Sequence, residues 1–144
     1  MADNNNGNRN RDVRSDNLRD SKMMAHLLDA LEDGTDIGHF GRLVFVMVAR
    51  HFEDDVHLLE LLVQQPGMDE HDARALLLQV EERGYNPPRR EQILAWQEQQ
   101  DFPICPTPDD PAGCNVYSEL RFPDEIYENI DEYWEERVEA DIEA

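Results

Sequence analysis

Apolar side chains recur every three or four residues in successive short segments of this chain, and glycine or proline separates most of these segments. That spacing places the apolar side chains on one face of an α-helix, whereas a half-buried β-strand would require strict alternation. We expect helices over residues 21–32, 36–52, 54–65 and 69–83, a fifth that starts at Pro88, and a last one that starts at Pro123. The pattern therefore predicts an all-α protein, a compact bundle of about six helices.

Residues that start and stop helices lie at the ends of these segments. A short polar side chain favours a helix start because it accepts a hydrogen bond from one of the first free backbone N–H groups. Such N-caps are expected at Ser21, Asp36, Asp54 (or Asp55) and Asp69. Gly34 and Gly84 suit the left-handed conformation that commonly ends a helix, and Pro66-Gly67 interrupts the third segment.

The second segment is apolar nearly all round, which is typical of a helix in the middle of a bundle. Residues 43–48 are rich in β-branched side chains, so a buried strand is the alternative there, although the helical flanks favour a helix. In the third segment Val56, Leu59 and Leu62 are expected to face the core. In the fourth, the expected core residues are Ala73, Leu76, Leu77 and Val80.

Acidic side chains outnumber basic ones by 33 to 13, which gives a net charge of −20 over 144 residues. They share their segments with leucine, valine, isoleucine and tryptophan, so they indicate an acidic folded surface rather than a disordered acidic tail. Lys22 is the only lysine. This composition is similar to that of proteins from salt-loving archaea, where a screening length of about 3 Å at molar salt weakens self-repulsion.

Residues 1–19 contain few large apolar side chains and are predicted to be a disordered tail, followed by a single helical domain over residues 20–144. No apolar run reaches the roughly 18 residues that a membrane span requires. The first residues also lack the apolar stretch of a secretory signal. We therefore expect a cytoplasmic protein with no membrane partner.

Residues 101–122 contain four prolines and the only two cysteines, and their large apolar side chains predict an ordered loop. Eight residues separate Cys105 from Cys114, whereas zinc sites usually pair cysteines two to four residues apart. Two packed thiols are favoured, with a disulfide as the alternative. The five histidines show neither metal-site spacing nor a neighbouring nucleophile, so no metal, no cofactor and no enzymatic activity is expected.

Positive charge is concentrated in the segment Arg83-Gly84-Tyr85-Asn86-Pro87-Pro88-Arg89-Arg90. Guanidinium groups beside a turn that leads into a helix suit phosphate, and aromatic rings provide stacking faces for unpaired bases. The candidate contacts to nucleic acid or to a partner are Arg83, Tyr85, Arg89, Arg90 and Trp96. The alternative is a packed turn, with the tyrosine in the core and the arginines paired to neighbouring glutamates.

Residues 84–94 (GYNPPRREQIL), Cys105 and residues 114–117 (CNVY) resemble the helical accessory region of archaeal primases, over about residues 54–122. That region, found in primase large subunits and in plasmid or viral primases, has a Tyr-x-Pro turn followed by a short helix and cysteines. The resemblance implies a non-catalytic accessory module of DNA replication that binds template, nucleotide or the catalytic primase. The family's iron–sulfur cluster needs four thiolates, and this chain has two cysteines.

Three further hypotheses fit the residues. The segments 54–65 and 69–83 have the layout of a helix-turn-helix, although the second of them is mostly acidic. The last helix carries Tyr133 and Trp134, which would suit a protein-interaction adaptor. The acidic surface itself would suit a mimic of DNA that binds a basic protein.

Overall fold

The computed structural model describes residues 16–128, which contain a short 3-10 helix, six complete α-helices and, over residues 124–128, the start of another helical segment. The elements are η1 (Leu18–Asp20), α2 (Lys22–Glu32), α3 (Gly38–Ala49), α4 (Asp55–Leu62), α5 (Glu70–Arg83), α6 (Arg90–Gln97) and α7 (Val116–Glu119). No β-strand occurs among these residues. The predicted all-α bundle is therefore confirmed, and the first five predicted helices correspond to α2 through α6.

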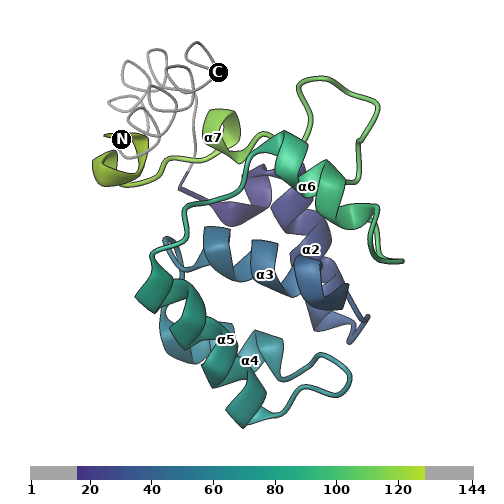
Figure 1. The fold of residues 1–144 in the computed structure, drawn as a ribbon, viewed down its shortest axis with the longest axis vertical. Coiled ribbons are helices and arrows are strands. Elements are labelled where there is room, and N and C mark those ends of the chain that lie inside the picture. Colours follow the sequence, from purple (N-terminus) through teal and green to yellow (C-terminus); the bar gives the residue numbers. More distant parts are fainter. Residues whose placement is uncertain (1–15, 129–144) are drawn as a thin grey trace, which may run out of the picture.

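Helix α3 lies in the middle of the bundle and contacts α2, α4, α5 and α6. Figure 1 shows α4 and α5 on one side of it, α6 on the other, and α2 behind. The segment 43–48 lies within α3, so the alternative of a buried strand is wrong. Within residues 16–128 no helix is both long and apolar enough to cross a membrane.

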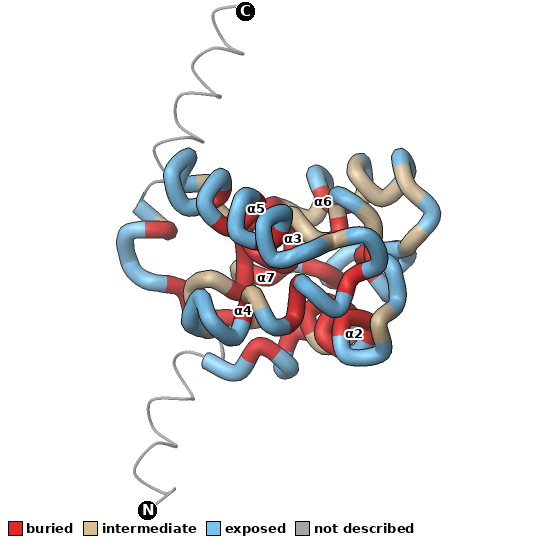
Figure 2. Tube along the Cα trace, turned by 90° about the horizontal axis from the view of Figure 1, so that it is seen from below, coloured by how far each residue is buried: buried red, intermediate tan, exposed pale blue. Residues whose placement is uncertain are grey.

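The buried residues lie toward the inside of the bundle, and exposed residues form its outer surface (Figure 2). The predicted core face of α5 is confirmed, since its four apolar residues are all buried. The predicted face of α4 is partly wrong: Val56 is 65% exposed, and Leu58, Leu61 and Leu62 are the buried residues. Two overlapping apolar faces are possible on this leucine-rich helix, and packing against α2, α3 and α5 selects one of them.

Three of the predicted N-caps are confirmed by their hydrogen bonds. The Ser21 hydroxyl accepts from the N–H of Met24, and the Asp54 carboxylate accepts from that of His57. Asp69 and Asp72 form a reciprocal capping box at the start of α5. At the other end of α5, Gly84 has φ +62°, the left-handed conformation predicted for it.

The start of α3 differs from the prediction, because the N-cap is Ile37 and not Asp36. Isoleucine has no group that can cap a helix, so other side chains bind the free N–H groups. Asp36 accepts from Gly38 N–H, while the side-chain amide oxygens of Gln65 and Gln100 accept from Ile37 N–H and Phe40 N–H, each at 2.9 Å. Two distant glutamines therefore complete this helix start.

The tail predicted over residues 1–19 ends earlier than expected. The Asn17 side chain caps η1, and Leu18 is buried against α2. Arg19 forms ion pairs with Asp29 and Glu32 on the outer side of α2. Residues 18 and 19 therefore belong to the folded part. Leu18 adds apolar area to the core, and the ion pairs of Arg19 hold it against α2. Residues 1–15 lie outside the described part.

The loop over residues 101–122 is ordered, as predicted, and contains the one-turn helix α7, which was not predicted. Cys105 and Cys114 form a disulfide with a Cα–Cα distance of 5.8 Å. The expectation of two thiols, which rested on a cytoplasmic location, is therefore wrong. Arg90 donates to the carbonyls of Pro108 and Asp110, and Cys105 N–H donates to the Gln97 side chain, so both ends of α6 hold this loop.

The chain becomes helical again after Pro123, over residues 124–128. The remainder of the predicted last helix, including Tyr133 and Trp134, lies outside the described residues. Tyr127 packs near Phe122 and Tyr117, and Phe122 in turn contacts His51 on the segment after α3. This aromatic cluster joins the end of the described chain to the central helix.

His51, which contacts Phe122 of this cluster, makes the free energy of unfolding depend on pH. Burial, with a smaller effect from Arg50, lowers the pKa of His51 to about 4. Above pH 6.5 the imidazole is neutral in both states. Between pH 6.5 and 4 only the unfolded chain takes up the proton, so the free energy of unfolding should fall by about 2 kcal/mol after solvent screening is allowed for.

Urea denaturation of the wild-type protein and of His51→Phe between pH 7 and 4 checks this prediction. Phenylalanine keeps the ring contact with Phe122, and the buried Nε2 atom that it removes has no hydrogen-bond partner within the described part of the chain. The difference in stability between the two proteins should grow as the pH falls. A constant difference over that range would contradict the assignment.

Candidate ligand-binding site

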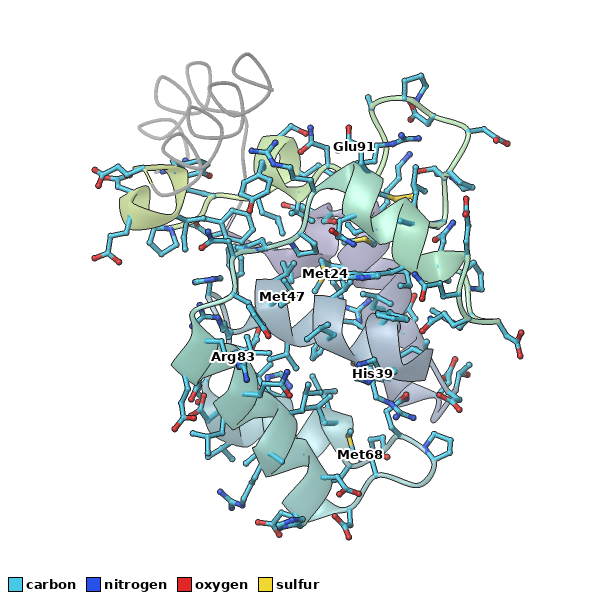
Figure 3. All side chains as sticks on the ribbon, viewed as in Figure 1. Met24, His39, Met47, Met68, Arg83 and Glu91 are labelled. Atoms are coloured by element: carbon cyan, nitrogen blue, oxygen red, sulfur yellow. A yellow bond between two sulfur atoms is a disulfide. The ribbon has the colours of Figure 1, made fainter. Side chains whose placement is uncertain are left out.

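A pocket of about 460 Å³ opens between α3, the end of α5, the segment connecting α5 to α6, α6 itself and α7. Figure 1 shows that connecting segment running past α3, and Figure 3 shows Met47 on α3 and Arg83 near the end of α5. The pocket is lined by Leu43, Met47, Gln79, Tyr85, Asn86, Pro87, Pro88, Arg89, Gln92, Trp96 and Tyr117. Its volume lies within the range of small-molecule sites, about 300–1,000 Å³.

Three aromatic residues line the pocket, and two of them are held in place. The Trp96 ring stacks on Phe40, with centroids 5.5 Å apart and planes inclined by 14°. One face of the indole is therefore covered, and only the opposite face can receive a planar ligand. The Tyr117 hydroxyl donates to the Pro87 carbonyl, and burial raises the pKa of this phenol, so it stays protonated.

The connecting segment is fixed to the bundle before any ligand binds. Pro87 and Pro88 are buried. Arg50 of the turn after α3 donates to the Tyr85 carbonyl at 3.3 Å. The Arg89 guanidinium lies 5.9 Å from the centre of the Tyr117 ring, which is within the range of a cation–π contact. These contacts preorganise the pocket, so binding would cost little ordering of the backbone.

The electrostatics of the pocket differ from those of the whole chain. Among residues 16–128, Arg89 is its only charged lining residue and no carboxylate lines it, although the chain carries 33 acidic side chains. Arg50 and Arg90, which flank the connecting segment, donate to backbone carbonyls and form no ion pair within residues 16–128. The Glu81 carboxylate interacts electrostatically with Arg50, so Arg89 is the charge that the described lining presents to a ligand, and it favours an anionic group.

Three of the five predicted contact residues, Tyr85, Arg89 and Trp96, come together in the pocket. The other two do not line it: Arg83 is exposed at the end of α5, and Arg90 holds the 106–113 loop. The alternative of a packed turn is correct in part, because Tyr85 is half-buried. However, neither Arg83 nor Arg90 forms an ion pair with a glutamate among the described residues.

Sequence reasoning missed the pocket residues that come from other elements: Leu43, Met47, Gln79, Gln92 and Tyr117. Local sequence carries no signal for them, because an exposed glutamine or a half-buried leucine is ordinary on a bundle helix. Tyr117 was marked only by its place after Cys114. The fold alone brings these residues beside Tyr85 and Arg89.

The structure bears on two other predictions, a helix-turn-helix over α4 and α5 and the absence of a metal site. Helices α4 and α5 pack together, as a helix-turn-helix would, but α5 exposes Glu70, Asp72, Glu81 and Glu82. Such a helix presents acceptors where base edges and phosphates need donors. Within residues 16–128 no group of three or more histidine, cysteine, aspartate or glutamate residues is arranged to hold a metal ion.

Comparison with models of known protein families finds no match, and comparisons with curated proteins and with solved structures find none either.

Proposed function

We propose that this protein is a non-catalytic binding module of DNA replication, and that the pocket between α3, α5 and α6 binds unpaired nucleic acid. The observation that carries the proposal is the lining of that pocket. Tyr85 and Trp96 supply aromatic faces, Arg89 supplies a guanidinium, and none of the described lining residues is a carboxylate that would repel a phosphate. Proteins that bind single strands combine these same elements, stacking platforms with positive charge.

The proposed mechanism is binding without turnover. A base would stack on the free face of Trp96, while the adjacent phosphate would pair with Arg89. The role beside a primase follows from the resemblance of residues 84–94 and 114–117 to the accessory region of archaeal primases. Seven of those residues, among them Tyr85, Arg89 and Tyr117, line the pocket, so the resemblance and the cavity point to the same surface. A salt-adapted protein would perform this role at molar KCl.

The test is fluorescence anisotropy with a labelled single-stranded oligonucleotide of mixed sequence in molar KCl. Stacking of one base on an aromatic side chain contributes about 1–3 kcal/mol, so Trp96→Leu should weaken binding at least about fivefold. Arg89→Gln should weaken it as well. Arg74→Gln is the matched control, because Arg74 is an exposed arginine on α5 that pairs with Glu70 away from the pocket.

The same measurement separates the alternatives. Absence of binding by the wild-type protein, or equal loss in the Arg74→Gln control, would overturn a nucleic-acid site in this pocket. An acidic DNA mimic would instead compete with DNA for a basic protein. Co-purification of a catalytic primase with the wild-type chain, lost on Arg89→Gln, would support the placement in replication.

A further inference from the structure

The large apolar side chains that remain exposed are confined to one pair of helices. Among residues 16–128 there are three of them: Val56 is 65% exposed, Val63 38% and Leu78 52%. Val56 lies on α4, Val63 is the C-cap of α4, and Leu78 lies on α5. These two helices pack against each other, and Figure 1 shows them together at one end of the bundle. Single exposed apolar residues scattered over a surface need no explanation, whereas three on one helix pair require one.

The three side chains belong to one outer surface of this helix pair. Val56 and Val63 are seven residues apart, which is about two helical turns, so they share one side of α4. Burial, and after it the neighbouring carboxyl group of Asp55, raises the pKa of Glu81, so the start of α4 lies beside the last turns of α5. Leu78 lies one turn before Glu81 and is therefore near the end of α4 that carries Val56. We call this surface the α4–α5 face.

Carboxylates accompany the apolar side chains on the α4–α5 face. Residues 54–83 contain eight acidic and two basic side chains, and all eight acidic residues are exposed. Glu60 lies between Val56 and Val63 on the same side of α4, and Glu82 lies one turn after Leu78. The face therefore combines exposed apolar groups with a negative charge.

This charge decides which kind of partner fits. A second copy of the chain would place carboxylates against carboxylates, and Arg74, which could offset them, is already paired with Glu70. The segments outside the described residues do not suit the face either. Residues 129–144 contain seven acidic side chains and one basic one, and residues 1–15 contain only Met1 and Val13 as large apolar side chains. A basic partner with its own apolar side chains is the complementary occupant.

We propose that the α4–α5 face docks a basic amphipathic helix of a partner protein. The apolar side chains of that helix would lie on Val56, Val63 and Leu78, and its lysine or arginine side chains would pair with the surrounding carboxylates. Helix recognition of this kind combines apolar anchors at helical spacing with complementary charge. The inference goes beyond the proposed function, because none of the three apolar residues lines the pocket. Three partly exposed anchors give a small contact, which is typical of a weak, transient complex.

The test uses the full-length protein and synthetic peptides that carry a fluorescent label. The first peptide is a helix of about 18 residues with leucines along one face and lysines on both flanks. The second has the same composition, with the leucines distributed around the helix. Fluorescence anisotropy is measured in molar KCl, where a screening length of about 3 Å removes the general attraction of basic peptides to a chain of net charge −20.

We expect the amphipathic peptide to bind at least about fivefold more tightly than the redistributed one, the usual effect of losing an apolar anchor. Leu78→Gln should weaken binding of the amphipathic peptide by a similar factor. Glutamine matches leucine in length and in helix propensity, and Leu78 is exposed, so α5 keeps its stability. Val56→Thr, which keeps the shape of the side chain but makes it polar, should weaken binding in the same direction.

A matched pair of charge variants checks the position of the contact. Glu60→Gln and Glu98→Gln change the net charge equally, but Glu98 is the exposed C-cap of α6, on the other side of α3 (Figure 1). Glu60→Gln should weaken binding by about twofold, the size of an exposed ion pair. Glu98→Gln should leave it unchanged.

Three results would overturn the proposal. Equal affinity for the two peptides, or affinity that Leu78→Gln does not change, would mean that the protein attracts basic peptides by charge alone. Equal effects of Glu60→Gln and Glu98→Gln would place the contact elsewhere. A wild-type dimer in sedimentation velocity that Leu78→Gln dissociates would show that the face binds a second copy instead. Oligonucleotide binding in the pocket is measured separately, so none of these results decides the proposed function.

Discussion

Replacing Phe45 by alanine is expected to lower the free energy of unfolding by about 3–5 kcal/mol, the usual cost of deleting a buried aromatic ring. Phe45 is fully buried on α3, the helix that contacts four others. The cavity would open at the centre of the bundle, where no single neighbouring helix can move to fill it. Because whole domains are stable by only about 5–15 kcal/mol, this change should shift the midpoint of urea denaturation markedly.

Val56 provides the control for this prediction. It is also a large apolar residue, but on α4 its side chain is 65% exposed. Val56→Ala should change the free energy of unfolding by no more than about 0.5 kcal/mol. A loss at Val56 comparable to that at Phe45 would mean that α4 faces the bundle with the side predicted from its sequence, and that the observed orientation is wrong.

Replacing Gln65 by leucine is expected to destabilise the fold by about 3 kcal/mol, because buried polar groups would lose their partners. Gln65 is 3% exposed. Its oxygen accepts from Ile37 N–H at 2.9 Å and from Arg42 Nε at 3.1 Å, and its nitrogen donates to the Thr35 carbonyl at 2.7 Å. One amide thus joins the end of α4 to the turn between α2 and α3.

Gln65→Glu separates the contribution of the acceptor oxygen of Gln65 from that of its donor nitrogen. A carboxylate keeps the acceptor for Ile37 and Arg42 but cannot donate to Thr35, so its cost at neutral pH should be smaller than that of leucine. Thermal denaturation of both variants measures the difference. If the leucine variant is no less stable than the glutamate variant, the acceptor for Ile37 and Arg42 contributes nothing measurable; if both are as stable as the wild type, none of the hydrogen bonds of Gln65 does, and the prediction fails.

The candidate site was only partly accessible to sequence reasoning. Tyr85 and Arg89 stand in a short stretch that turn-forming prolines and clustered arginines make conspicuous, and Trp96 follows one helix later. Arg90 belongs to the same stretch, yet its guanidinium holds the disulfide loop through Pro108 and Asp110. Adjacent positions at a helix start point in different directions, and the neighbouring chain decides which of them faces a cavity.

The pattern of charged residues predicted the overall surface but not the composition of the pocket. The excess of acidic residues correctly indicated a folded chain with an acidic surface, because those residues alternate with apolar ones at helical spacing. It did not reveal a pocket whose described lining contains no carboxylate, because that depends on which segments meet in the fold. The pairing of Cys105 with Cys114 was also open, since spacing permits a disulfide and only the fold brings the two Cα atoms to 5.8 Å.

Sequence alone determined the helices, their order and most of their ends, because apolar periodicity, N-cap side chains and the conformational freedom of Gly84 act over a few neighbouring residues. The tertiary structure decided which face of α4 is buried, how the start of α3 is capped, and which side chains line the pocket. Those outcomes depend on residues such as Ile37 and Gln100, which are 63 positions apart and meet only when the chain has folded.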